Sequence, residues 1–472
     1  MKIKKDVKMY INGKWVVGNN KDIMLDENPS TGNTFAMIPK CSDEDIDHAV
    51  SSARDAFESW SETSPSERSL MIRKVGDILK KREKCFIDII VKELGMPIKY
   101  CKDFQVAGSI DEAYYFADIL DNYKFEIKQK GGSIIREPFG VAAFITPWNY
   151  PLDQITIKVF PAIAAGNCVV VKPSKLTPLT GLLLAEVFQE ANFPPGVFNM
   201  VTGVGSEVGN AMANHPDIDI ISFTGSTITG KALGAKAIAS TAKKVILELG
   251  GKSAMIILES GDFEAALDEV LDSVFLNSGQ TCCAFTRLLI PASKKKEIEN
   301  LIVYKSTKYV VGNPQDPSTD IGPVISQDAL KKIKAYVQSG ISEGASLLVG
   351  GKHHNNSTGY YINPIVFTDV TPDMTIARDE IFGPVLSVIS YNSVSEAISI
   401  ANDTIFGLDG SVYGNPDDAI KVARQIRSGN VHINGALYSN EFPFGGYKQS
   451  GLGREGSIYG FEEYLEIKSI LY

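Results

Sequence analysis

The sequence predicts an α/β fold organised around a doubly wound parallel sheet. From about Gly140 onward, short continuous apolar runs alternate with helical patterns, and each run ends in Gly, Pro or Asn. Continuous runs indicate strands buried on both faces, which is typical of a parallel sheet covered by helices. A chain of 472 residues with 44% hydrophobic residues is long enough for two or three domains. The runs occupy residues 141–145, 168–171, 197–201, 219–223 and 245–247, with 254–258 close behind.

The N-terminal third of the sequence predicts a hairpin followed by helices that cover the sheet. Residues 9–15 alternate apolar and polar side chains around an Asn12-Gly13 turn, which indicates a hairpin. Ser42, followed by three acids, is typical of a helix N-cap, and further helices are expected over 65–81 and 83–94. We expect these helices to cover the sheet.

Composition excludes several classes of partner. The chain has 47 Lys and Arg against 56 Asp and Glu, a net charge of −9, and it has no long basic run. Nucleic acid and anionic membrane are therefore not expected as partners. Six cysteines without CxxC spacing indicate reduced thiols. Because no stretch has the length and apolarity of a membrane span or signal peptide, we expect a cytoplasmic protein. The five histidines show no metal-ligand spacing, so no metal is expected.

A nucleophile is a candidate in the connection at 277–287, which contains Cys282 and Cys283. This small, polar stretch lies between a helical pattern and an apolar run, so it presents side chains instead of packing them. From these residues alone, both cysteines could equally be small buried hydrophobes, which is the commoner role of a free cysteine.

Polar residues follow each predicted strand. They include Asn149 after the first run, Lys172 and Ser174 after the second, and Glu248 after the fifth. Two glycine loops, at 202–209 and 224–230, follow the third and fourth runs, although neither has the strict GxGxxG pattern. Because parallel sheets bind ligands at the carboxyl ends of their strands, this edge is the expected ligand site.

Seven motifs occur between residues 147 and 448: Pro147-Trp148-Asn149, Lys172-Pro173-Ser174, Phe223-Thr224-Gly225-Ser226-Thr227, Leu247-Glu248-Leu249-Gly250-Gly251-Lys252, Gly279-Gln280-Thr281-Cys282, Glu380-Ile381-Phe382-Gly383-Pro384 and Pro443-Phe444-Gly445-Gly446-Tyr447-Lys448. In their order and spacing they resemble the aldehyde dehydrogenase superfamily, and the resemblance covers nearly the whole chain. The resemblance implies NAD(P)-dependent oxidation of an aldehyde to a carboxylic acid.

The resemblance assigns three catalytic residues. Cys282 is the nucleophile that attacks the aldehyde and forms a thiohemiacetal. Asn149 donates its side-chain amide to the resulting oxyanion, together with the backbone amide of Cys282. Glu248 activates the water that hydrolyses the later thioester. Relatives that pass the acyl group to coenzyme A lack a glutamate at this position, so Glu248 favours water as the acceptor.

The implied cofactor is NADP or NAD. Many NAD-preferring relatives have a glutamate where this chain has Lys175, and a lysine pairs with a 2′-phosphate that a carboxylate would repel. NADP is therefore mildly favoured, although Lys175 could also extend into solvent. The residues assigned to cofactor binding are Ile145, Thr146, Trp148, Lys172, Ser174, Lys175, Gly205, Gly209, Thr224, Gly225, Ser226, Leu249, Glu380 and Phe382.

Five residues match positions at the aldehyde site of relatives. Tyr150, Tyr438 and Phe444 predict an apolar, aromatic entrance, and Cys283 is expected to line the same tunnel. Ile157 occupies the place where succinic semialdehyde dehydrogenases carry a substrate-binding arginine. Without that cation an ω-carboxylate would be poorly paired, so an uncharged aliphatic or aromatic aldehyde is expected.

The resemblance also implies a domain plan. Residues 1–119 and 139–248 are expected to bind the cofactor, 249–450 to form the catalytic domain, and 120–138 with 451–472 to form an oligomerisation arm. Within the arm, the segments at 123–138 and 464–470 are expected to form strands outside the main sheet, and exposed strand edges pair with other chains. A homodimer or homotetramer is therefore expected.

Two other functions stay open from the sequence. The same cysteine could catalyse acyl transfer or ester hydrolysis without productive hydride transfer. Alternatively, the chain could be a binding protein that has kept the fold without activity. Loss of Cys282, Glu248 or Asn149 would be expected in the second case, and all three are present.

Overall fold

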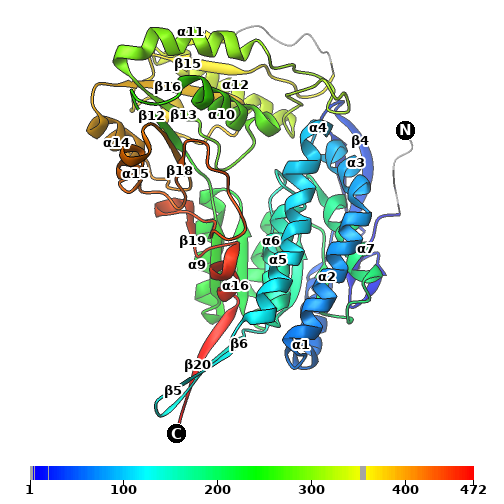
Figure 1. The fold of residues 1–472 in the computed structure, drawn as a ribbon. Helices are drawn as coiled ribbons and strands as arrows, with labels where there is room; N and C mark the ends of the chain where they lie inside the picture. Colours follow the sequence, from blue (N-terminus) through cyan, green and yellow to red (C-terminus); the bar gives the residue numbers. More distant parts are fainter. Residues whose placement is uncertain (1–3, 5, 20, 351–357) are drawn as a thin grey trace.

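The computed structural model describes residue 4 and residues 6–19, 21–350 and 358–472. Two large sheets form two lobes, and a thin three-stranded sheet extends away from the lower lobe (Figure 1). The sequence positions of His353 and His354, and most of the basic start at 1–5, lie outside the described residues. None of the helices in the described part is long and apolar enough to cross a membrane.

The first sheet has eight strands in the order β19-β11-β10-β7-β8-β9-β1-β2. Its five central strands are parallel, which confirms the doubly wound sheet predicted from the apolar runs. The predicted hairpin is also confirmed and adds β1 and β2 at one edge. The strands are β1 (Met9–Ile11), β2 (Lys14–Val16), β7 (Val141–Ile145), β8 (Cys168–Lys172), β9 (Phe198–Met200), β10 (Ile220–Thr224), β11 (Lys244–Glu248) and β19 (Gly451–Leu452).

Helices cover both faces of this sheet (Figure 1). Ser42 caps α1 in a capping box with Asp45, and the predicted helices at 65–81 and 83–94 are confirmed as α2 and α3. A six-residue π-helix, Lys102–Ala107, joins α4 to α5. The helices of this lobe are α1 (Asp43–Ser61), α2 (Pro65–Lys81), α3 (Glu83–Glu93), α4 (Ile98–Cys101), α5 (Gly108–Asn122), α6 (Asp153–Ala165), α7 (Pro178–Glu190), α8 (Gly205–Asn214), α9 (Thr227–Thr241) and α16 (Ser457–Glu462).

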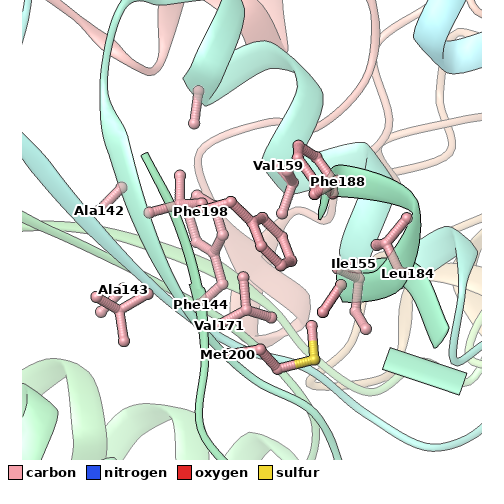
Figure 2. Packing of buried hydrophobic residues seen from close by; sticks show 14 of the residues in the cluster. Ala142, Ala143, Phe144, Ile155, Val159, Val171, Leu184, Phe188, Phe198 and Met200 are labelled. Atoms are coloured by element: carbon pink, nitrogen blue, oxygen red, sulfur yellow. The ribbon is translucent and has the colours of Figure 1, made fainter. Parts of the chain in front are cut away.

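Apolar packing fixes α6 and α7 against the sheet. Figure 2 shows Phe144, Val171, Phe198 and Met200 from the strands together with side chains from both helices. The rings of Phe188 on α7 and Phe198 on β9 stack with centroids 4.0 Å apart. Complete burial of each such side chain contributes about 1.5–3 kcal/mol. This packing holds the connection between β7 and α6, which carries Asn149, in one position.

The second sheet has seven strands in the order β14-β15-β16-β13-β12-β17-β18, and only its β14–β15 pairing is antiparallel. The chain crosses from the first sheet to the second between Glu248 and Ala254. The strands are β12 (Ala254–Ile257), β13 (Arg287–Pro291), β14 (Ser346–Val349), β15 (Ile365–Thr368), β16 (Val385–Tyr391), β17 (Gly410–Tyr413) and β18 (His432–Ile433). The helices are α10 (Phe263–Phe275), α11 (Lys295–Ser306), α12 (Gln327–Ser342), α13 (Thr375–Arg378), α14 (Val394–Asn402) and α15 (Pro416–Ala423).

Two smaller antiparallel sheets complete the chain. β3 (Ile23–Asn28) pairs with β4 (Asn33–Pro39) near the N-terminus. β5 (Glu126–Gln129), β6 (Gly132–Pro138) and β20 (Leu465–Leu471) form the projecting sheet, with β6 in the centre (Figure 1). The segments at 123–138 and 464–470 therefore form strands outside the main sheet, as predicted, whereas Gly451–Leu452 of the expected arm forms β19 in the first sheet and Ser457–Glu462 forms helix α16.

Candidate active site

A cleft opens at the carboxyl ends of β7, β10 and β11, where the two lobes meet. It is lined by Asn149 from the first sheet, by Cys282 from the second lobe, and by Glu380 and Phe382 from the segment before β16. Residues far apart in the sequence therefore meet at the carboxyl ends of the parallel strands, where the ligand site was predicted.

An unusual backbone presents Cys282. Asn277, Ser278 and Gly279 all have left-handed φ values, of 51°, 58° and 75°, in the turn that follows α10. A Cβ on Gly279 would lie 2.2 Å from the backbone of Gly383, so only glycine allows these segments to approach so closely. The hydroxyl of Ser278 donates to the carbonyl of Gly322 at 2.9 Å. Contacts with neighbouring segments therefore hold this turn.

Asn149 is tied to the turn that carries the cysteine. Its side-chain Nδ2 donates to the carbonyl of Gln280 at 3.1 Å, and its own carbonyl accepts from Nδ2 of Asn277 at 2.9 Å. Asn149 is buried, and its amide has a second hydrogen that this bond does not use. The structure thus brings two predicted catalytic residues to one cleft and couples their backbones.

Cys283 and Glu380 lie near the thiol of Cys282. The pKa of the thiol is raised well above its usual value, first by a hydrogen bond with Cys283, then by burial and by the charge of Glu380. Cys282 lines the cleft, whereas Cys283 is not among its lining residues. A base is therefore needed before Cys282 acts as a nucleophile.

Glu248 ends β11 and is buried. Burial raises the pKa of its carboxyl well above the usual value, Glu455 and Cys282 add to this effect, and Lys158 opposes it. Neither carboxyl oxygen has a hydrogen-bond partner in the described part of the chain. The oxygens lie beside Gly445 and Gly451, not among the groups that line the cleft. Burial without partners is the environment of a group that exchanges protons.

A buried ion pair, which was not predicted from the sequence, lies beside Glu248. Lys158 on α6 pairs with Glu455, and both side chains are at most 2% exposed. Lys158 also donates to the hydroxyl of Thr224 at 2.7 Å. Because 297 residues separate Lys158 from Glu455, no local pattern reveals the pair.

The glycines after Glu248 allow two close approaches. A Cβ on Gly251 would lie 2.4 Å from the carbonyl oxygen of Cys282, and one on Gly250 would lie 2.5 Å from the carboxylate of Glu380. The backbone N–H of Gly251 donates to Oε1 of Glu380 at 3.0 Å. These glycines therefore bring the cysteine, Glu380 and the end of β11 to one place.

Two aromatic rings form one wall of the cleft. Trp148 and Phe382 meet edge to face, with ring centroids 5.4 Å apart and planes at 83°. Phe382 has a left-handed φ of 61°, which is costly for an aromatic residue. Burial raises the pKa of Glu380, although the N–H of Gly251 opposes this rise. Flat apolar walls beside a carboxylate fit a nicotinamide ring with its ribose.

The other predicted cofactor residues lie at the same sheet edge. Thr224, Gly225, Ser226 and Leu249 line the cleft, and Ser226 caps α9 by accepting from the N–H of Thr229. The N–H of Gly225 donates to the carbonyl of Glu248 at 3.0 Å. The N-cap of α9 therefore lies at the cleft, and the N-terminus of a helix favours anions.

More of the predicted cofactor residues lie along the same edge of the first sheet, outside the residues that line the cleft. Lys172 is buried at the end of β8 beside Gly205 on α8, and burial lowers the pKa of its amine to about 8. Ile145 lies against Gly209, and the buried hydroxyl of Thr146 has no partner among the described residues.

The turn after β8 completes this set of residues. The hydroxyl of Ser174 accepts from the N–H of Leu176. Lys175 is exposed and forms no salt bridge with any residue that the structure describes.

The predicted substrate residues form two groups, one around Tyr150 and one around Tyr438. Tyr150 bonds to the hydroxyl of Thr281 at 2.7 Å, close to Cys283. Tyr438 and Phe444 meet edge to face at 6.1 Å. A Cβ on Gly456 would lie 2.7 Å from the hydroxyl of Tyr438 and 3.7 Å from Ile157, so these side chains share one region.

Metal ligands are not grouped in the described part of the chain. No three His, Cys, Asp or Glu residues there gather closely enough to hold an ion.

The chain is similar to known proteins over nearly its whole length. The sequence profile described as the aldehyde dehydrogenase family matches residues 15–470. The chain belongs to the aldehyde dehydrogenase family. A 3-succinoylsemialdehyde-pyridine dehydrogenase from Pseudomonas is 43% identical over 466 residues, which cover 98% of each chain.

Solved structures of aldehyde dehydrogenases share the whole fold. Aldehyde dehydrogenase C from Pseudomonas syringae, a cysteine-to-alanine variant with NAD⁺ and octanal, is 43% identical with a TM-score of 0.97 over 98% of this chain and 96% of that one. An aldehyde dehydrogenase from Mycobacterium tuberculosis with NAD⁺ is 39% identical, with a TM-score of 0.97 over 100% and 99%. This aldehyde dehydrogenase is therefore an oxidoreductase that uses a nicotinamide cofactor.

Proposed function

We propose that this aldehyde dehydrogenase oxidises an uncharged aldehyde to the carboxylic acid through a covalent adduct on Cys282. The observation that carries the proposal is the single cleft that Cys282 shares with Asn149, Glu380 and Phe382. A nucleophile, an amide donor and a cofactor-shaped wall meet there.

The first step begins with loss of the Cys282 proton to solvent water, and the resulting thiolate attacks the aldehyde carbon. The carbonyl oxygen becomes negative, and the unused side-chain hydrogen of Asn149 donates to it together with the backbone N–H of Cys282. Removal of one such donor costs about 2.7–4 kcal/mol of transition-state stabilisation in a comparable enzyme. The bond from Asn149 to Gln280 keeps the amide oriented towards the cysteine. A bound nicotinamide supplies the hydride acceptor that turns this adduct into a thioester.

Glu248 then activates water against the thioester. Its buried carboxyl has a raised pKa, so it accepts a proton more readily than an exposed carboxylate does. The carboxyl group must rotate from its position beside Gly445 and Gly451 to reach the cleft. The Lys158–Glu455 pair borders its present position and maintains a fixed charge environment there.

The environment of Glu248 favours water over coenzyme A as the acyl acceptor. A carboxylate activates water directly, and transfer to a thiol does not require one at this position. Esterase chemistry without hydride transfer would use Cys282 and Asn149 and would not need Glu380 or the aromatic wall. Because both lie within the same cleft, oxidation is the better-supported function.

We propose that this enzyme uses NADP as well as NAD. Lys175 is exposed next to Lys172 at the end of β8, so the amine is free to pair with a 2′-phosphate. The two solved structures described above are complexes with NAD⁺, and we propose that this chain accepts NADP at least as well.

The substrate side supports an uncharged aldehyde. Tyr438 and Phe444 provide aromatic surface, and Ile157 provides an alkyl group where a cation would be needed to pair an ω-carboxylate. A similar protein was solved with octanal.

A panel of aldehydes with both cofactors tests this proposal. Formation of reduced nicotinamide should be fastest, as kcat/KM, for hexanal or benzaldehyde. A higher kcat/KM for succinic semialdehyde would contradict the uncharged substrate. Absence of reduced nicotinamide with every aldehyde would contradict oxidation itself.

A further inference from the structure

The π-helix at Lys102–Ala107 places one buried side chain next to the active site. π-Helical turns are rare and are frequently found at functional sites. Within this turn Lys102, Asp103 and Phe104 are exposed, whereas Gln105 is 1% exposed. A buried amide is costly unless its groups are paired, so the partners of Gln105 are informative.

Gln105 donates to the backbone of the oxyanion donor. Its Nε2 lies 3.0 Å from the carbonyl oxygen of Asn149 and 3.2 Å from the sulfur of Met96. Because a carbonyl only accepts, the NH₂ group of Gln105 must face Asn149, and the amide orientation is defined. Its Oε1 is buried without a partner in the described part of the chain.

Two donors therefore converge on one carbonyl from opposite parts of the fold. Asn277 reaches it at 2.9 Å from the turn that carries Cys282, and Gln105 reaches it from the helical layer of the first lobe. The bond from Asn149 to Gln280 ties the side chain to the same cysteine turn. Gln105 therefore ties the Asn149 backbone to the helical layer that covers the first sheet.

We propose that Gln105 is a positioning residue that fixes Asn149 for stabilisation of the oxyanion on the Cys282 adduct. The inference rests on the proposed function, because it assigns Asn149 the role of oxyanion donor. Gln105 is not among the residues that line the cleft, so it is not expected to touch substrate or cofactor. It acts by holding the Asn149 backbone, and displacement of a catalytic group by about 1 Å can reduce rates about 100-fold.

Replacement of Gln105 by leucine removes the donor and keeps similar volume. The kcat for aldehyde oxidation should fall about tenfold or more, since a displaced oxyanion donor weakens transition-state stabilisation. The KM for aldehyde and the affinity for NAD⁺ should change less than twofold, because the oxyanion forms only after binding. A purely structural role would instead lower stability and leave kcat per folded enzyme unchanged.

Replacement of Gln105 by glutamic acid gives the sharper test. A buried carboxyl has a raised pKa, and its protonated form donates an O–H to the Asn149 carbonyl as the amide does. The ratio of Gln105→Glu to wild-type kcat should therefore be near one at pH 6 to 7 and fall as the pH rises and the carboxyl ionises. The matched control is Gln189→Glu, on the exposed side of α7, where Gln189 accepts a hydrogen bond from Trp15 that a carboxylate also accepts.

The outcomes are distinct. A pH-dependent ratio for Gln105→Glu, with a flat ratio for the Gln189→Glu control, supports the positioning role. Wild-type kcat in Gln105→Leu, or a flat ratio for Gln105→Glu, overturns it. If wild-type enzyme forms no reduced nicotinamide from any aldehyde, the proposed function has failed instead.

Discussion

At the scale of residues, the two adjacent cysteines differ in what surrounds them. Cys282 lines the cleft and its carbonyl oxygen lies beside Gly251, whereas Cys283 is not among the residues that line the cleft. The sequence pattern could not separate them, because both lie in the same small polar connection. Only the resemblance to a family favoured Cys282, and the position of its side chain in the cleft supports that choice.

Some residues of the site could not be predicted because their partners are distant in sequence. Lys158 meets Glu455 across 297 residues, and Gln105 meets Asn149 across 44. A lysine on an apolar helix and a glutamine in a short helical segment have no local signature of function. Their roles follow from burial, which the sequence alone does not show.

A charge reversal at Lys175 tests the cofactor proposal. Lys175→Glu should lower kcat/KM with NADP about tenfold or more and affect NAD little, because a carboxylate repels the 2′-phosphate. The measurement is the ratio of kcat/KM for the two cofactors. Lys296→Glu, on the exposed surface of α11, is the matched control and should leave the ratio unchanged. An unchanged ratio in Lys175→Glu would rule out the proposed phosphate contact.

At the scale of elements, the strands of the first sheet were predictable because their runs are apolar throughout and buried on both faces. α1 was predictable from its Ser42 cap and α2 from its residue pattern. The π-helix was not, and neither was the left-handed turn at Asn277 to Gly279. These features depend on contacts with other segments, and local propensity carries little information about them.

The contact at Gly279 gives a prediction for the turn. Gly279→Ala adds a methyl group 2.2 Å from the Gly383 backbone, in addition to the cost of a positive φ, and Gly344→Ala adds one at φ +99° with nothing within 4 Å. The control should cost about 1 kcal/mol of unfolding free energy, and Gly279→Ala about 1–3 kcal/mol more. Denaturant unfolding of both variants measures the difference, and Gly279→Ala should also lose activity. Equal free energies of unfolding for the two variants would show that the turn accommodates the added methyl group without loss of stability.

At the scale of the whole molecule, the catalytic groups come from both lobes. The crossing at 249–253 carries the two glycines that admit the backbone of Cys282 and the carboxylate of Glu380. The sequence predicted a strand at 254–258 but not that it begins the second sheet, because an apolar run does not specify its neighbours. The proposed division into cofactor and catalytic domains places its boundary in this crossing.

The projecting sheet carries the prediction on assembly. β20 is an edge strand, and its Ile467 and Leu471 are 65% and 83% exposed. Apolar edge strands pair with other chains, so we propose that this sheet joins subunits of 51.3 kDa into a dimer or tetramer. Light scattering of an Ile467→Lys, Leu471→Lys double variant should show a smaller species than wild type. Leu70→Lys, equally exposed on α2, should not change the mass. A wild-type monomer would contradict the proposal.

The central claim is that Cys282 forms the acyl intermediate and that Glu248 promotes its hydrolysis. The most direct measurement is the amount of reduced nicotinamide formed per subunit when enzyme, aldehyde and cofactor are mixed. Wild type and Cys283→Ala should turn over continuously, Glu248→Gln should form about one equivalent and then slow markedly, and Cys282→Ala should form none while still binding the cofactor. Continuous turnover by Cys282→Ala, or a fully active Glu248→Gln, would contradict the account.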